Sequence, residues 1–150
     1  MTSQTLNPVK KRSGRAPKVV ISEAELNHIE ALAEGAYQRN PTLADRLLEE
    51  LSRARIVKAA KMPENVVSMG SHVVYRDETT GQETSITLVY PEHADIARQR
   101  VSLMTPIGVS LLGLSEGAVF DWNTRDNERR TLTVIRVRQP AAADTPVAGT

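Results

Sequence analysis

Residues 84–113 read TSITLVYPEHADIARQRVSLMTPIGVSLLG, and this stretch decides the fold. Apolar and polar residues alternate over 84–90, which is the period of a half-buried β-strand. Thr105 and Pro106 then suit the N-cap and the first position of a helix, and Gly113 suits its end. The stretch therefore predicts a strand, a connection and one short helix that runs through Leu112 and is ended by Gly113.

The two-residue period recurs on both sides of this stretch. Residues 77–81 (DETTG) have the composition of a turn, and residues 124–129 form a second polar turn. Strands that are joined by such short turns pair in antiparallel fashion. The expected strands are 72–76, 84–90, 118–122 and 131–137, with a further short strand at 101–104.

The N-terminal third of the chain follows a helical period instead. A capping box at Ser22 and Glu25 starts one helix, and Pro41 starts another. We therefore expect helices over 22–38 and 41–55 that pack as an antiparallel hairpin. The fold class is then α+β, a short helical hairpin followed by an antiparallel β-sheet domain with one short helix. The expected seam of the hairpin consists of Leu26, Ile29, Ala33, Leu43, Leu47 and Leu51.

Both ends of the 150-residue chain lack any period. Residues 1–17 are polar and basic, so we expect a disordered basic tail, and residues 140–150 read as a second disordered tail. The ordered body then divides into the helical hairpin, 18–60, and the sheet domain, 64–139.

Charge is unevenly distributed along the chain, whose formal net charge is +1. Beyond residue 18 there are 14 basic and 18 acidic residues, a net charge of −4. A mildly acidic body binds nucleic acid poorly. We therefore expect direct contact with nucleic acid only through the basic tail.

Composition excludes several classes of protein. Aromatic residues make up only 3% of the chain, which leaves no platform for stacking nucleobases. Cysteine is absent, which excludes disulfides and Cys-ligated zinc and favours a cytoplasmic location. Since no apolar run reaches about 18 residues, we expect no membrane span.

No group of residues points to catalysis or to a cofactor. His28, His72 and His93 lack the spacing of metal ligands. Ser71 and His72 are neighbours on an expected strand and would point to opposite faces, so they make a poor nucleophile pair. We expect no catalytic residue, no metal site and no cofactor, and hence a protein that is not an enzyme.

Three segments resemble the Rnk family, called regulators of nucleoside diphosphate kinase and related to the Gre transcript-cleavage factors. They are VVSMGSHVVYRDETTGQE (66–83), ITLVYPEHADIARQRVSLMTPIGVSLLGL (86–114) and EGAVFDW (116–122). The segments look like a Gre-type C-terminal domain, and the resemblance extends over 18–139. It implies an FKBP-like fold for 64–139, and it implies that the helical hairpin is a shortened coiled coil.

The resemblance also implies binding to bacterial RNA polymerase near its secondary channel, so that any effect on DNA would be indirect. In Gre factors the C-terminal domain docks on the rim of the polymerase. We expect Leu111 and Leu112 to point inward and the turn before them to be exposed. The turn that matches the Gre docking surface consists of Met104, Thr105, Pro106, Ile107 and Gly108.

In Gre factors the coiled coil enters the channel, and acidic residues at its tip help to hold a catalytic magnesium ion. The matching tip, Gln38, Arg39, Asn40 and Pro41, has no carboxylate, and Asp45 lies one turn into the second helix. The first expected helix would be about 25 Å long, much shorter than in a Gre hairpin. We therefore expect a factor that competes with Gre factors without stimulating transcript cleavage.

Two other functions stay open. The family name suggests direct binding to nucleoside diphosphate kinase, although no residue of the sequence indicates it. An FKBP-like fold suggests a prolyl isomerase, but such an enzyme lines its pocket with several aromatic residues and this chain has five in total. Phe120 and Trp122 are better explained as sheet packing.

Overall fold

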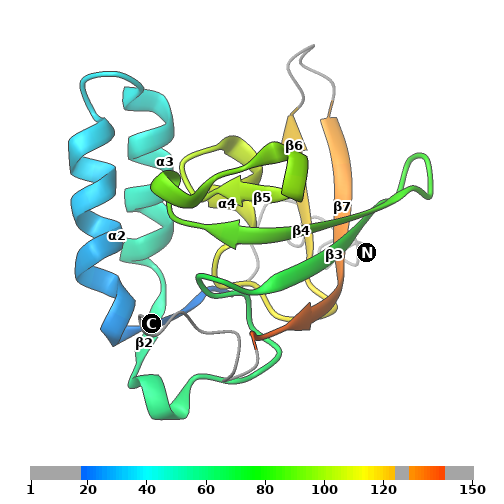
Figure 1. Ribbon diagram of the computed structural model, residues 1–150, viewed down its shortest axis with the longest axis horizontal. Coiled ribbons are helices and arrows are strands. Elements are labelled where there is room, and N and C mark those ends of the chain that lie inside the picture. The colour runs from blue at the N-terminus through cyan, green and yellow to red at the C-terminus, as the bar shows by residue number, and fades with distance from the viewer. Residues whose placement is uncertain (1–17, 124–128, 141–150) are drawn as a thin grey trace, which may run out of the picture.

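The structure is a computed structural model that describes residues 18–123 and 129–140, with the side chains of Trp122 and Asn123 left out. It is a mixed α+β fold in which two helices stand beside a mostly antiparallel sheet (Figure 1). The tail 1–17, most of the tail 140–150 and most of the turn 124–129 lie outside the described residues. Among the residues described, no helix is long and apolar enough to cross a membrane.

Helices α2 (Glu23–Ala36) and α3 (Pro41–Ser52) lie side by side and run in opposite directions (Figure 1). Helix α2 has 14 residues and is therefore about 21 Å long, shorter than expected. Ser22 caps it by accepting a hydrogen bond from the N–H of Ala24. The residues between the helices are buried or half-buried: Leu26, Ile29, Ala33, Leu43, Leu47 and Leu51.

A small parallel sheet closes the open end of the two helices. Strand β1 (Val20–Ser22) pairs with β2 (Arg55–Val57) in parallel register. The prediction that the second helix reaches residue 55 is therefore wrong. The chain leaves the helix at Ser52 because Arg55 donates its N–H to the carbonyl of Val19, a partner that lies before the first helix.

The main sheet has the strand order β5-β4-β3-β7-β6. All neighbouring strands are antiparallel except β4 and β5, which are parallel, so the expectation of a purely antiparallel sheet is wrong at this edge. Parallel neighbours require a crossover connection, and residues 90–99 provide one. The strands are β3 (His72–Asp77), β4 (Glu83–Val89), β5 (Arg100–Ser102), β6 (Val119–Asn123) and β7 (Arg129–Arg138).

Short 3-10 helices make up the connections. Helix η2 covers Ala59–Lys61 after the parallel pair. The crossover holds η3 (Pro91–His93) and η4 (Ile96–Arg98). It ends at Gln99, whose φ of 59° reverses the chain into β5. The remaining helix, α4 (Pro106–Leu111), follows β5 and ends one residue earlier than predicted.

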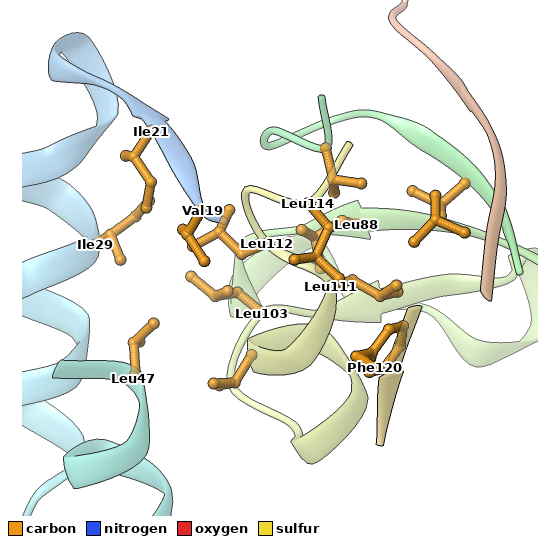
Figure 2. Packing of buried hydrophobic residues seen from close by; sticks show 14 of the residues in the cluster. Val19, Ile21, Ile29, Leu47, Leu88, Leu103, Leu111, Leu112, Leu114 and Phe120 are labelled. Carbon is orange, nitrogen blue, oxygen red and sulfur yellow. The ribbon is translucent and has the colours of Figure 1, made fainter. Parts of the chain in front are cut away.

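One hydrophobic core runs from the helices into the sheet (Figure 2). Ile21 lies beside Ile29 at the helical end, and Val19 lies beside Leu112 at the sheet end. Both residues of the N-terminal segment are almost fully buried. Gly113, at a φ of 82°, lies so close to this segment that an added Cβ would be 2.4 Å from the Val19 Cγ1 atom. The helical pair is therefore joined to the sheet through buried side chains as well as through the chain.

Candidate functional site

The turn Met104–Gly108 is held by its own hydrogen bonds. Thr105 Oγ1 accepts a bond from the N–H of Gly108 at 3.1 Å and donates one to the carbonyl of Ser102 at 2.8 Å. The Ser102 hydroxyl in turn accepts the N–H of Met104 at 2.9 Å. Pro106 occupies the first turn of α4. The predictions of Thr105 as N-cap and Pro106 as first helical residue are therefore confirmed.

The five residues of this turn differ in exposure. Pro106 is exposed, and Met104, Thr105 and Ile107 are half-buried. Ile107 is half-buried and packs against the hydrophobic core, so the expectation that the turn is exposed is only partly met at this residue. Leu111 and Leu112, one turn further along, are buried as predicted. The surface offered to a partner is Pro106 with the flanks of its half-buried neighbours.

Gly108 is buried, so the expectation that the turn is exposed is wrong at this residue. An added Cβ would lie 2.4 Å from the carbonyl oxygen of Ser102 and 2.8 Å from that of Leu103. Since these are backbone atoms, they cannot rotate away. Strand β5 and Leu103, the residue after it, approach the helix so closely that only glycine fits at this position.

The four residues of the predicted tip, Gln38, Arg39, Asn40 and Pro41, are all exposed. Asn40 Oδ1 accepts the N–H of Leu43 at 3.2 Å and so caps α3, while Pro41 begins it. The predicted break between the helices is confirmed at these residues. Hence this tip presents an amide, a guanidinium and a proline ring to solvent.

Asp45 lies one turn into α3, where its carboxylate accepts a hydrogen bond from the hydroxyl of Tyr37. This bond raises the pKa of the Tyr37 phenol, and the charge of Asp45 and desolvation act in the same direction. The carboxylate closest to the start of α3 is therefore hydrogen-bonded to the side chain that follows the end of α2.

In the part of the chain that the structure describes, no hydrogen bond or ion pair joins residues 38–41 to residues 104–108. The helix that follows the tip, α3, instead contacts the helix that follows the turn, α4, through one pair of side chains. Arg46 Nη2 donates to the hydroxyl of Ser110 at 2.5 Å, and Ser110 donates to the carbonyl of Pro106 at 2.9 Å. This contact fixes α4 against α3. Sequence reasoning missed it because 64 residues separate the two partners.

The base of α2 contacts the sheet through polar side chains. The rings of His28 and Tyr90 stack with centroids 4.1 Å apart. Glu25 does not complete the predicted capping box, because its carboxylate accepts the backbone N–H of Met69. Burial raises the pKa of Glu25, and the Met69 bond partly offsets this effect. Burial and the neighbouring carboxylates of Glu25 and Glu92 raise the pKa of Tyr90 to about 12.

Ser71 and His72 do not form a nucleophile pair. The hydroxyl of Ser71 donates to Gln139 Oε1 at 2.7 Å and accepts the N–H of Ser68. The ring of His72 instead lies 2.9 Å from the hydroxyl of Thr87. Across residues 18–123 and 129–140, no three His, Cys, Asp or Glu side chains are grouped so that they could hold a metal ion.

The chain matches two family profiles that together cover most of the described residues. Residues 17–57 match the Rnk N-terminus, and residues 62–139 match the C-terminal part of the transcription elongation factors GreA and GreB. The fold thus defines a Gre-type C-terminal domain with a short helical pair in front of it.

Individual relatives give the same result. The regulator of nucleoside diphosphate kinase from Escherichia coli K12 is 33% identical over 85% of this chain and 94% of its own length. GreA from a Chelativorans species is 28% identical over 71% of this chain and 67% of its own. A Nitrosomonas europaea elongation factor GreA/GreB has a structure that matches with a TM-score of 0.66 and 32% identity, covering 81% of this chain and 98% of the other. The chain therefore belongs to the Rnk family of regulators, the relatives of the Gre elongation factors.

Proposed function

We propose that this protein regulates transcription by binding RNA polymerase near the rim of its secondary channel through the turn Met104–Gly108. The observation that carries the proposal is the combination of an Rnk N-terminus with a GreA/GreB C-terminal part in one chain. In Gre factors the matching turn belongs to the docking surface, as the resemblance implies. We place the contact at the exposed ring of Pro106 and at the flank of Ile107.

The turn suits docking because its shape is set before a partner arrives. Both hydroxyl bonds of Thr105 are made within the chain, and Pro106 fixes its own backbone angle. A surface that is already ordered loses less conformational freedom on association. The buried Gly108 and Leu111 hold the turn against the sheet from below.

We also propose that residues 64–139 form an FKBP-like domain and that α2 and α3 are a shortened coiled coil. A helix of about 21 Å reaches less far into a channel than a long hairpin. Magnesium needs oxygen ligands that can reach it. The tip residues 38–41 supply no carboxylate, and Asp45 is hydrogen-bonded to Tyr37. The protein would therefore occupy the rim without stimulating transcript cleavage.

Competition with a Gre factor gives the sharpest test. Purified RNA polymerase is loaded with labelled GreA, and the unlabelled protein is titrated into the complex. We expect displacement at micromolar concentration and no increase in transcript cleavage in a parallel assay. Retention of GreA at all concentrations, together with no binding of the protein to free polymerase, would contradict the proposal.

A second function is favoured by the name of the E. coli relative, regulator of nucleoside diphosphate kinase. In this alternative the chain binds the kinase directly. Sedimentation of the protein with purified kinase, and separately with purified polymerase, distinguishes the two. Co-sedimentation with the kinase alone would favour the alternative, whereas co-sedimentation with polymerase alone supports the first proposal.

We propose no enzymatic activity for this chain and a cytoplasmic location, where polymerase is found. Phe120, one of the five aromatic residues, is buried in the core, where it is unavailable to line an open pocket. A proline-peptide isomerisation assay checks this point, and we expect a rate equal to the uncatalysed one.

A further inference from the structure

The sheet has one face toward the core and one face that is open. Side chains alternate between the faces along each strand. Val73 of β3 and Ile86 of β4 are buried in the core. Their neighbours His72 and Ser85 are exposed, and Val74 is half-buried. The open face therefore carries the polar members of the alternation.

Strand register brings basic and hydroxyl side chains into one row across four strands. His72 lies opposite Arg138 of β7 on one side and opposite Thr87 of β4 on the other. Thr87 is in turn the register partner of Arg100 in β5. With neighbouring strands about 4.8 Å apart, the row is about 14 Å long.

A second row lies beside the first, where Val74 stands between Ser85 and Arg136. His72 and Arg138 of the first row and all three residues of the second row line a hollow with a volume of about 250 Å³, together with Val73 and Ile86. No carboxylate lines this hollow.

Arginines at the two ends of the sheet differ in whether they form ion pairs. At the β3–β4 turn, Arg76 contacts Glu78 at 3.2 Å and Glu83 at 3.8 Å, and Arg130 contacts Asp77 at 2.6 Å. At the other end, within residues 18–123 and 129–140, no ion pair reaches the guanidinium groups of three residues. They are Arg100, Arg136 and Arg138.

Two carboxylates near this end, those of Glu116 and Asp95, have other partners. Glu64 and Glu116 line a separate hollow that Arg138 also borders. Glu116 accepts the backbone N–H of Val137 at 2.8 Å. Asp95, in the crossover before β5, contacts Arg98 at 3.7 Å.

The acidic charge of the body lies elsewhere. Residues 23–53 hold seven carboxylates and three arginines, a net charge of −4, whereas residues 54–139 hold eleven basic and ten acidic residues. The expectation that the body binds nucleic acid poorly rests on its total charge. The distribution leaves a basic region at one end of the open face of the sheet, around His72, Arg136 and Arg138.

We propose that the open face around His72, Arg136 and Arg138 binds the phosphodiester backbone of a single-stranded nucleic acid. Guanidinium forks and hydroxyl groups are the donors that phosphate oxygens accept. The lining also includes three apolar side chains, Val73, Val74 and Ile86, but its charged groups are all basic, which favours a polyanion over a protein partner of mixed charge. The row of about 14 Å suits an extended polyanion better than a single phosphate group.

This site would bind without regard to base sequence. The residues that line the hollow include no Phe, Tyr or Trp ring on which a base could stack, and the ring of His72 lies against the hydroxyl of Thr87. Affinity would therefore come from charge and would fall steeply with salt. The inference stands apart from the polymerase proposal, because it concerns a different face and a different ligand.

The test measures fluorescence anisotropy of a short labelled oligouridine with the full-length protein at about 50 mM salt. We expect Arg136→Gln with Arg138→Gln to weaken binding about tenfold or more. The double variant should also reduce the slope of log affinity against log salt by about 1.4, the value for two lost phosphate contacts to a single strand.

The matched control is Arg53→Gln with Arg76→Gln, which removes the same charge from arginines that are paired with carboxylates. It should change the affinity by less than about twofold, and both double variants should melt cooperatively. Equal losses in the two variants would assign binding to total charge and overturn the proposal. Unchanged affinity in both double variants, as expected if only the basic tail binds, would overturn it as well. Binding of polyglutamate as tight as that of the oligouridine would also overturn it.

Discussion

Helices α3 and α4 begin with the same local chemistry, but the residues at their starts lie in different surroundings. Asn40 and Pro41 start the first, and Thr105 and Pro106 start the second, in each case with a side-chain cap and a proline in the first turn. The residues ahead of α3 are all exposed. Those at the start of α4 are half-buried apart from Pro106, and Gly108 of its first turn is pressed against β5.

The tip before α3 and the turn before α4 therefore look alike in the sequence but differ in what supports them. The tip before α3 is supported by the seam between the two helices, by the Asn40 cap and by the Tyr37–Asp45 hydrogen bond, all of which lie within the helical pair. The turn before α4 is supported by the sheet, by Ser102 and by the Arg46–Ser110 contact. A docking surface needs a fixed shape, so the turn before α4 is the better candidate of the two.

The largest expected effect comes from breaking the seam of the helical pair. Leu47→Asp places an unpaired carboxylate at a side chain with 0% exposure and should cost about 3–5 kcal/mol of unfolding free energy. Chemical denaturation measures this loss. Thr42→Asp adds the same charge at an exposed position of α3 and should leave stability nearly unchanged. Equal midpoints for the Leu47 variant and the wild type would show that the seam is not formed.

Two glycine substitutions compare the regions directly. Gly108→Ala brings a Cβ against backbone atoms at 2.4–2.9 Å and should destabilise by about 1–3 kcal/mol. Gly35→Ala, near the end of α2, meets nothing within 4 Å and should stabilise by about 0.5–1 kcal/mol. Thermal unfolding of both variants gives the signs. A Gly108 variant as stable as the wild type would contradict the close approach of β5.

A smaller effect is expected where the helical pair meets the sheet. Burial raises the pKa of Glu25 above its ordinary value of 4.5, so the folded state binds this proton more tightly than the unfolded chain. The resulting stability is present at low pH and is lost as the pH rises through the folded pKa. Glu25→Gln stays neutral and can still accept the Met69 N–H, so it should be more stable than the wild type at pH 7.

The pH profile is the measurement for this variant. The advantage of Glu25→Gln should vanish below the ordinary carboxyl pKa, and the pKa of Tyr90 should fall from about 12 because one neighbouring charge is gone. NMR titration of labelled tyrosine reports the second effect. A variant that is less stable than the wild type at pH 7 would mean that the ionised carboxylate stabilises the joint.

The sequence predicts the features that depend on neighbouring residues. Ser22, Pro41 and Thr105 mark three helix starts because a cap acts within one turn of its own residue. Alternation over 84–90 finds β4 because each strand residue reports its own face. The inward direction of Leu111 and the break at the tip follow from the same local rules.

The rest depends on partners far along the chain. Strand β2 escapes prediction because its partner β1 precedes both long helices. The burial of Gly108 is set by β5 and Leu103, and the Arg46–Ser110 contact spans 64 residues. Simple alternation from the buried Leu132 and Val134 would place Arg136 and Arg138 in the core, and an irregularity in the β3–β7 register moves them to the open face. That they lack ion pairs among the described residues follows only from the register.

The central claim is that the turn before α4 binds RNA polymerase, and variant affinities for purified polymerase test it most directly. Ile107→Glu places a charge on the flank of the turn, and Pro106→Glu does so at its exposed first residue. Because Ile107 is half-buried, the Ile107→Glu protein could fold poorly. The Pro106→Glu protein then keeps the test valid, because Pro106 is exposed and a carboxylate is favourable in the first turn of a helix. Ile96→Glu is the control, at a side chain that is 79% exposed in the crossover.

Folded Ile107→Glu and Pro106→Glu proteins should bind polymerase at least tenfold more weakly than the wild type, a loss of about 1.4 kcal/mol or more. Ile96→Glu should bind like the wild type. Normal binding by both turn variants, or an equal loss in the Ile96 variant, would contradict docking at Met104–Gly108.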